Sequence, residues 1–304
     1  MSAVSTATAR PLQPAPLRTA LFFTIIVALL ELAGGLFAHS LALLADAAHV
    51  GMDVVALVIA VAASIQSRRP ANERQSYGFA RFEVIAALAN GGLLFGVTLF
   101  IAIEALRRFA AAQLPDGALM AGVAFAGLAI NVGIGLSLAK AAHSDMNVKA
   151  AFLHVASDAV GALAVGLGGL AVFVSGVAWI DPALSLLVCG VIVAGVVRIV
   201  RESSEVLLES APAHAAIPHV RERLCALPGV VGVHDLHVWS IGSGSHVLSA
   251  HVLLHDKRIS EASGILRQIE ARAHDEFDID HVTIQFECES CDASDRIICT
   301  QVRR

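Results

Sequence analysis

Two acids and a histidine interrupt an apolar stretch of this sequence, at a spacing that could bind a metal ion. In LLADAAHVGMDVVAL, His49 and Asp53 are four positions apart, and Asp46 precedes His49 by three. Residues at these intervals lie along one face of a helix. The segment FLHVASDAVGA repeats the pattern with His154 and Asp158. We therefore expect two helices that each present one imidazole and one carboxylate.

A shared metal site is the simplest explanation for these two pairs. Placing an acid at the centre of a membrane span costs about 2.5 kcal/mol or more of free energy. Four ionisable groups in two spans are therefore best explained if they bind one ligand together. Together they would form a site of two nitrogen and two oxygen ligands, which suits tetrahedral Zn²⁺. Ca²⁺ prefers more oxygen ligands, and Cu⁺ prefers sulfur. The alternative is that they are polar contacts between spans, which explains one pair more easily than two matched pairs.

Asp46 has no single interpretation from the sequence. It could lie behind the metal ligands, form a hydrogen bond between helices, or bind a proton. Glu31, Asn90 and Asn131 also fall within apolar segments and are interpreted as interhelical hydrogen-bonding groups.

The elements that must position these residues are membrane-spanning helices. The 304 residues are 56% hydrophobic and 15% charged, with a mean hydropathy of +0.72, which is too apolar for an ordinary soluble domain. A bilayer core of roughly 30 Å requires about 20 helical residues. A tail at 1–16, expected to be flexible, precedes a transport domain at 17–208. Six segments of that domain are long enough, near 17–38, 41–65, 81–109, 116–140, 148–174 and 180–206.

The distribution of basic residues predicts the orientation of these spans. Only Arg107 and Arg108 fall on one face of the membrane. The other face has Arg10, Arg18, Arg68, Arg69, Arg74, Arg81, Lys140, Lys149, Arg198 and Arg201. By the positive-inside rule both termini are cytoplasmic, and we expect a bacterial-type inner membrane. No basic run suggests nucleic-acid binding.

The sequence changes character at 209–288, where it predicts a small cytosolic α+β domain. The element order is α-β-β-α-β, an open sheet, with Ser260 as the expected N-cap of the second helix. A C-terminal tail follows at 289–304.

A second metal site is expected on the open face of this sheet. Alternation along the strands places His251, Glu287 and His237 on that face. Cys288 and Cys291 follow with the spacing of a metal clip. The alternative is a solvated polar face with two free thiols.

Several motifs in order resemble those of the cation diffusion facilitator family. They are GGLFAHSLALLADAAHVGMDVVAL, RQSYGFARFEVIAALANG, FLHVASDAVGALAV, VLLESAP and HDLHVWSI, between about Glu31 and Glu287. The resemblance implies a six-span homodimer with a cytosolic metal-binding domain, which exports divalent metal in exchange for protons. It implies His49, Asp53, His154 and Asp158 as the transport ligands of a zinc-preferring member. In the cytosolic site it favours His234 over His237.

The charge of the ion indicates why such export must be coupled. Moving Zn²⁺ out against an inside-negative potential costs about 4.6 kcal/mol per 100 mV, at ~2.3 kcal/mol per charge. Protons compete with zinc for imidazole and carboxylate, so the ligands themselves can couple the two ions. We expect Zn²⁺ as substrate and as regulatory ligand, with Cd²⁺, Co²⁺ or Ni²⁺ as further substrates, and no organic cofactor.

Two other functions remain to be weighed against transport. An intramembrane zinc hydrolase needs an open coordination position and a general base, and the chain has no H-E-x-x-H motif. A membrane-anchored zinc sensor would not need ionisable residues in its spans.

Overall fold

The computed structural model describes residues 14–110, 113–139, 146–242 and 244–288. The chain divides into two compact units, one made of Met1–Ile59 and Ala89–Arg198, the other of Ala60–Leu88 and Ile199–Arg304. Each unit is described by itself below.

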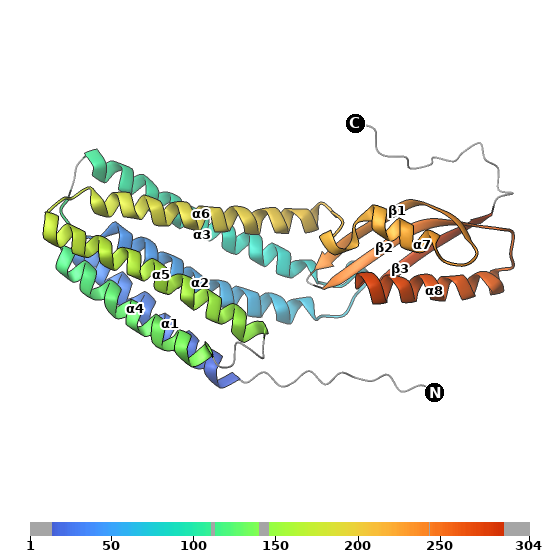
Figure 1. The fold of residues 1–304 in the computed structure, drawn as a ribbon, viewed down its shortest axis with the longest axis horizontal. Helices are drawn as coiled ribbons and strands as arrows, with labels where there is room; N and C mark the ends of the chain where they lie inside the picture. The colour runs from blue at the N-terminus through green and yellow to red at the C-terminus, as the bar shows by residue number, and fades with distance from the viewer. Residues whose placement is uncertain (1–13, 111–112, 140–145, 243, 289–304) are drawn as a thin grey trace. The chain divides into compact units, whose positions relative to one another are not determined.

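Six long helices account for the apolar two thirds of the chain (Figure 1). They are α1 (Pro14–Ala38), α2 (Leu41–Ser67), α3 (Arg81–Ala110), α4 (Gly117–Ala139), α5 (Met146–Ser175) and α6 (Ile180–Leu207). All six are long and apolar enough to cross a membrane. Large apolar side chains such as Phe37, Leu136 and Val174 are exposed on them, as hydrocarbon-facing side chains must be. The chain is therefore an integral membrane protein with six spans, as the sequence predicts.

Small residues bring α4 and α5 into close contact. A Cβ atom on Gly117 would lie 2.5 Å from the backbone nitrogen of Phe173, and one on Gly169 would lie 2.6 Å from that of Ala121. Only glycine permits backbones to approach so closely. These two glycines therefore allow α4 to support the α5 helix that carries His154 and Asp158.

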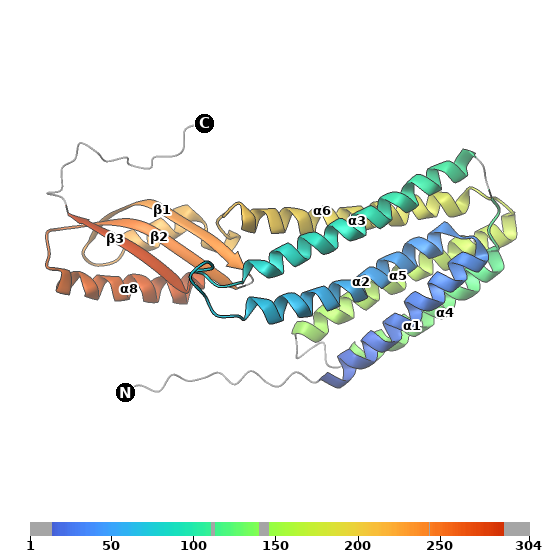
Figure 2. The ribbon, with the colours of Figure 1, turned by 180° about the vertical axis from the view of Figure 1, so that it is seen from behind.

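The α2 helix is held beside α5, as both ribbon views show (Figures 1 and 2). The buried cluster that joins them includes side chains of α1, α2, α4 and α5, namely Ala38, Ala42, Leu43, Met120, Ala124 and Val165. Three of these residues are alanines, and Leu43, Met120 and Val165 fill the space between the helices. A second buried cluster joins α2 to α3 and α6 through Ala45, Ile101 and Cys189.

The C-terminal region forms the expected α-β-β-α-β domain with a three-stranded sheet (Figure 2). After a short 3₁₀ turn at Ala213–Ala215, its elements are α7 (Ile217–Cys225), β1 (Val230–Gly242), β2 (Ser245–Leu254), α8 (Ile259–Phe277) and β3 (His281–Cys288). The strand order is β1-β2-β3. β2 is antiparallel to β1 and parallel to β3, to which the α8 crossover joins it.

One face of this sheet is covered and the other is open. Leu248, Ala250 and Val252 point inward and pack with residues of α7 and α8, including Ile269 and Phe277. The strand β3 adds its partly buried Val282, Ile284 and Phe286 to this core. All members of the core lie between residues 215 and 286, so the domain has a hydrophobic core of its own.

The predicted start of α8 is wrong by a few residues. The helix begins at Ile259, and Arg258 occupies the N-cap position without a side-chain hydrogen bond. Ser260 lies in the first turn, where its side chain is not the cap. The helix ends with Asp278 in the left-handed conformation, and the N–H of Ile279 reaches back to the carbonyl of Ala273 at 3.1 Å.

Candidate functional site

The α2 and α5 helices bring all four His and Asp side chains of the two pairs together. Asp53 Oδ2 lies 3.8 Å from His49 Nε2 on its own helix and 3.2 Å from His154 Nε2 on α5. Asp158 makes the reciprocal contacts, at 3.8 Å to His154 Nε2 and 3.9 Å to His49 Nε2. Each carboxylate therefore faces both imidazoles, one along its own helix and one across the helix interface.

Three of these side chains are compact enough to share one ion as they stand. His49, Asp53 and Asp158 each offer a ligand atom within 4.8 Å of the other two. The rings of His49 and His154 are edge to face, with centroids 6.4 Å apart. His154 therefore lies beside the group of three, and the member that its Nε2 contacts most closely is Asp53.

Two carboxylate oxygens at this junction lack hydrogen bonds. Asp53 Oδ2 and Asp158 Oδ1 are buried, with no hydrogen-bond partner among the described residues. Buried acceptors without partners are costly, so an arrangement that keeps two of them side by side needs a compensating ligand. A divalent cation between the carboxylates and the imidazoles would supply it.

The position of α2 depends on Asp181, which sequence reasoning did not single out. The Asp181 carboxylate of α6 accepts hydrogen bonds from the Ser40 hydroxyl at 2.6 Å and from the N–H groups of Leu41 and Ala42 at 2.8 and 3.2 Å. Ser40 Oγ in turn accepts from the N–H of Leu43 at 3.2 Å. A serine directly before an apolar helix is the usual N-cap signal, but its partner on α6 is visible only in the tertiary structure.

Two further acids are buried close to the site without belonging to the group of three. Asp46 is 5% exposed and lies against α5, where a Cβ atom on Gly161 would be 3.6 Å from its Oδ1. Glu31 of α1 is 1% exposed, and its Oε2 has no hydrogen-bond partner among the described residues. The expectation that Glu31 forms an interhelical hydrogen bond therefore fails for this oxygen.

A second cluster of possible ligands lies on the open face of the C-terminal sheet. His234 on β1 pairs in register with His251 on β2, and Glu287 is near the end of β3. The Glu287 carboxylate accepts hydrogen bonds from His234 Nε2 at 2.9 Å and from His251 Nδ1 at 2.8 Å. Burial favours the neutral form of Glu287, but these two hydrogen bonds outweigh it and lower the pKa of the carboxyl group. Two imidazoles and an ionised carboxylate form a donor set that suits zinc.

A β-bulge determines which histidine of β1 joins this cluster. The pairing of β1 with β2 shifts between His234 and His237, and Asp235 has a φ of +48°. His237 does point outward, as alternation predicts, but it is 62% exposed and contacts Asp235 at 3.0 Å. Simple alternation therefore selected the wrong neighbour for Glu287, because a bulge adds a residue that the period of two does not count.

Asp235 is a polar residue of this cluster that sequence reasoning missed. Its Oδ2 lies 3.6 Å from His251 Nε2, while its Oδ1 contacts His237. The position of Asp235 between His234 and His237 could have indicated it as a candidate. However, only the β-bulge turns the Asp235 side chain towards the open face of the sheet.

Of the two cysteines expected at this site, the structure describes only Cys288. Cys288 is half-buried on β3, directly after Glu287, and is not part of the group formed by His234, His251 and Glu287. Neighbouring residues of a strand point to opposite faces, which separates its thiol from that carboxylate. Cys291 lies outside the described residues.

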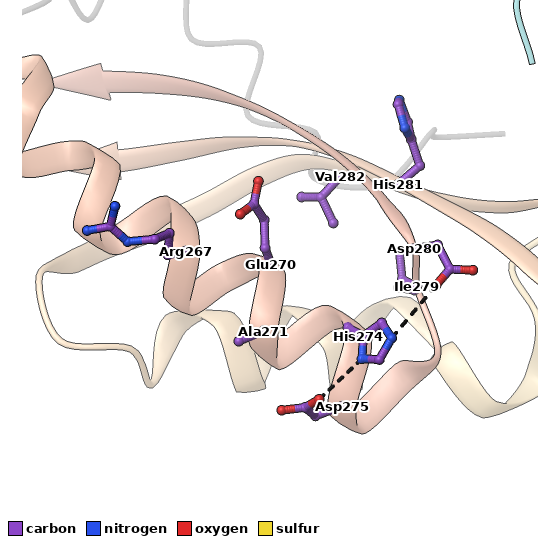
Figure 3. Close-up of a pocket in the computed structure, with 9 residues that line it drawn as sticks. All are labelled: Arg267, Glu270, Ala271, His274, Asp275, Ile279, Asp280, His281 and Val282. Carbon is purple, nitrogen blue, oxygen red and sulfur yellow. Dashed lines mark hydrogen bonds and ion pairs between the residues drawn. The ribbon is translucent and has the colours of Figure 1, made fainter. Parts of the chain in front are cut away.

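A hollow of about 640 Å³ between α8 and β3 is a separate feature (Figure 3). His274 there contacts Asp275 at 3.2 Å and Asp280 at 3.9 Å, while His281 points away from this group. His274, Asp275 and Asp280 are all exposed to solvent, so this group is an ordinary polar surface and not a second buried site.

Comparison with known proteins identifies both parts of the chain. Residues 17–208 match the cation efflux transmembrane domain, and residues 212–289 match the cytoplasmic domain of cation efflux proteins. The chain is 37% identical over 279 residues to the metal cation efflux system protein CzcD of Cupriavidus metallidurans, covering 92% of this chain and 88% of that protein. It is 35% identical over 272 residues to the zinc transporter ZitB of Escherichia coli, covering 88% and 85%.

A third relative and one solved structure complete the comparison. The cadmium, cobalt and zinc/H(+)-K(+) antiporter of Bacillus velezensis is 32% identical over 274 residues, with 89% of this chain and 87% of that protein covered. The solved structure is the metal-bound C-terminal domain of the CzcD transporter, 39% identical, which covers 23% of this chain and 96% of its own with a TM-score of 0.22.

Proposed function

Because this chain belongs to the cation efflux family, we propose that it exports Zn²⁺ from the cytosol in exchange for protons. The proposed transport ligands are His49, Asp53, His154 and Asp158. Cd²⁺ and Co²⁺ are proposed as further substrates, as the name of the Bacillus velezensis relative states for that protein. Ni²⁺ remains a candidate on donor chemistry alone. The chain is a transporter and not an enzyme.

One observation carries the proposal: each carboxylate of the two pairs faces both imidazoles. Asp53 lies 3.2 Å from His154 across the interface, and Asp158 lies 3.9 Å from His49. A set of two imidazoles and two carboxylates fits tetrahedral Zn²⁺, and Asp53 Oδ2 and Asp158 Oδ1, which face these imidazoles, are buried without a well-aligned hydrogen bond among the described residues.

Exchange follows from what zinc requires of these side chains. Zinc binds neutral imidazole and ionised carboxylate, so its arrival displaces protons from the same atoms. We infer that zinc loads from the cytosol as protons leave. The spans then open outward, and outside protons return to the histidines or aspartates and release the metal. Protons that enter the cell move down the membrane potential, which offsets part of the free energy needed to move a doubly charged ion outward.

The test is zinc flux in proteoliposomes that contain a zinc dye and a pH dye. The side equivalent to the cytosol is held at constant pH while the other side is varied. We expect flux to fall when the outer side becomes alkaline, and zinc movement to drive opposite proton movement. Zinc flux without any proton movement would identify a uniporter, and zinc binding without flux would favour a sensor anchored in the membrane.

We further propose that the cytosolic domain binds regulatory zinc and joins two chains into a homodimer. His234, His251 and Glu287 are the proposed ligands, because they converge from all three strands. The soluble domain has its own core, so calorimetry on residues 209–304 is a direct test. Zinc binding should weaken in His251→Ala, and also in Cys288→Ser if the Cys288 thiol is a ligand. A wild-type domain that does not bind zinc would contradict the regulatory site but not the transport site.

The bacterial relatives support an inner-membrane location. We propose that both termini are cytoplasmic, because the basic residues are concentrated on that side. Cysteine labelling of loops from either side of the membrane would test this orientation.

A further inference from the structure

The two halves of α2 differ in how closely the other helices surround them. Within residues 41–50 no residue is exposed, and most are buried. Within residues 51–67, all of which the structure describes, Ala63 is the only buried residue. The side chains of His49 and Asp53, at the boundary between the two halves, are 31% and 26% exposed. The bundle is therefore closed around the half in which α2 begins and more open beyond the metal ligands.

The closed half is the outer one in the proposed orientation. With both termini in the cytosol, α2 and α6 both begin on the outer side of the membrane. Zinc that leaves the span site outward must pass the beginning of α2. Because this part of α2 is packed on all sides, outward release requires that it separates from a neighbouring helix.

One buried carboxylate joins the beginnings of α2 and α6. Asp181 Oδ1 accepts hydrogen bonds from the Ser40 hydroxyl at 2.6 Å and from the N–H of Ala42 at 3.2 Å, and Oδ2 accepts from the N–H of Leu41 at 2.8 Å. Asp181 is 1% exposed and Ser40 is 0% exposed. Hydrogen bonds to an ionised acceptor are about twice as strong as neutral ones. These contacts therefore hold α2 against α6 at the outer end of both helices.

A second contact to the same corner comes from α3. Arg108 donates a hydrogen bond from Nη1 to the carbonyl of His39, the residue before Ser40. His39 has a φ of +54°, so the chain turns sharply between α1 and α2. The corner is thus held by side chains of α3 and α6, the two helices that pack on α2 but carry none of the four proposed metal ligands.

Cys189 of α6 lies between this corner and the metal ligands. It is 3% exposed and belongs to the buried cluster that includes Ala45 of α2 and Ile101 of α3. Along α2, Ala45 comes between Ser40 and His49. Any path from the outside to the ligands between α2 and α6 therefore passes Cys189, and its thiol can meet a water-soluble reagent only when that path is open.

We propose that Asp181 and Ser40 form a latch, which keeps the outer side closed and opens when α2 and α6 separate to release zinc. The inference rests on the proposed zinc–proton exchange, because exchange requires that the ligands face the outside at one stage. When the helices part, water replaces the lost contacts of the Asp181 carboxylate and of the N–H groups of Leu41 and Ala42. The strength of the latch determines how often the outward-open state forms.

The experiment follows alkylation of Cys189 by a charged maleimide that does not cross membranes. The reagent is added to the outer side of proteoliposomes that contain the full-length protein. Peptide mass spectrometry distinguishes Cys189 from the other cysteines, which all lie at position 225 or later. We expect slow labelling of the wild type without zinc and faster labelling during zinc flux.

Variants of the latch should open the outer side without zinc. Asp181→Asn keeps the size of the side chain but replaces one acceptor oxygen by an NH₂ donor, which cannot accept an N–H group of α2. Labelling of Cys189 should become about tenfold faster or more, as expected for the loss of a hydrogen bond to a charged group. Ser40→Ala removes one of the three contacts and should give a smaller increase. Asp116→Asn, the same exchange at the exposed cap of α4, is the matched control and should label like the wild type.

The outcomes separate this inference from the proposed function. A wild-type protein without zinc flux contradicts the proposed function. Zinc flux with Cys189 unlabelled throughout overturns only the latch, and so do equal labelling rates in the wild type and the latch variants. If Asp181→Asn does not fold, the comparison of the wild type with Ser40→Ala decides in the same way. A purely structural role of Asp181 would lower the unfolding temperature without changing how fast Cys189 is labelled in the folded protein.

Discussion

Asp181 on α6 holds Ser40 at the start of α2 through a hydrogen bond of 2.6 Å. Both residues are buried, with exposures of 1% and 0%. The same carboxylate accepts the first N–H groups of α2, which have no partner within the helix. A side chain distant in sequence thus determines where the helix that carries His49 and Asp53 begins.

Replacing Asp181 by alanine should destabilise the protein and reduce zinc flux. The change leaves buried N–H groups of α2 without an acceptor, which costs about 1–3 kcal/mol. Thermal unfolding in detergent and flux in proteoliposomes measure the two effects. Asp116 is a matched control, since its carboxylate accepts the N–H groups of Ala118 and Leu119 at an exposed helix start. An Asp116→Ala protein as unstable as Asp181→Ala would show that burial of the cap is irrelevant.

Removing one carboxylate of the span site should abolish transport without unfolding the protein. In Asp158→Ala, His49 and His154 lose a carboxylate that lies within 3.9 Å of both. We expect zinc flux to fall to the level of empty liposomes, while size-exclusion chromatography still shows folded protein. The same measurement on Asp53→Ala should agree. A folded Asp158→Ala protein with wild-type flux would contradict the proposed ligand set.

Exchanging an imidazole for a carboxylate should broaden the range of ions carried. His49→Asp changes the set from two nitrogens and two oxygens to one nitrogen and three oxygens, which is better suited to harder cations such as Mn²⁺ or larger ones such as Cd²⁺. Flux of manganese and cadmium relative to zinc should rise by several-fold. If the relative rates of the three metals stay as in the wild type, His49 does not contact the ion.

The bulge in β1 makes His234 and His237 a matched pair for testing the cytosolic site. His234 contacts Glu287 at 2.9 Å, while His237 is three residues away and contacts Asp235. His234→Ala should weaken zinc binding to the soluble domain by at least tenfold, and His237→Ala by much less. Calorimetry on both proteins decides. Equal losses of zinc affinity in the two variants would contradict this assignment, because they would mean that both histidines bind zinc in the metal-bound domain.

Acidification should destabilise the cytosolic domain partly through His246. This side chain is 8% exposed, and its Nδ1 shares a hydrogen bond of 3.0 Å with Ser240 Oγ. Burial, and then the nearby His214, lower the pKa of His246. Between that lower value and the unfolded value near 6.5, the unfolded chain binds a proton that the folded chain does not. The free energy of unfolding should therefore decrease as pH falls through about 6.5, and level off below the folded pKa.

Urea unfolding of the domain in the presence of a chelator, from about pH 8 to pH 5, measures this slope. His246→Gln should show a smaller slope than the wild type. His255→Gln, at an exposed histidine after β2, should retain it. A slope that is identical in the wild type and in His246→Gln would assign the acid sensitivity to other groups.

The amino-acid sequence by itself determined the six spans, the α-β-β-α-β order and the two His-Asp pairs. These features are local: hydropathy over a window predicts a span, and a separation of four residues places His49 with Asp53, and His154 with Asp158, on one helix face. Alternation in β3 is equally local: it places Glu287 on the open face, while its neighbours Val282, Ile284 and Phe286 pack on the covered face.

Contacts between distant segments were decided only by the tertiary structure. No local pattern shows that Asp181 caps α2, or that a bulge at Asp235 brings His234 rather than His237 to Glu287. Each depends on which backbone approaches which side chain after packing, and such pairings leave no periodicity along the chain. A helix period can place an acid in a bundle, but whether that acid meets a partner, another acid or nothing at all depends on the neighbouring helices.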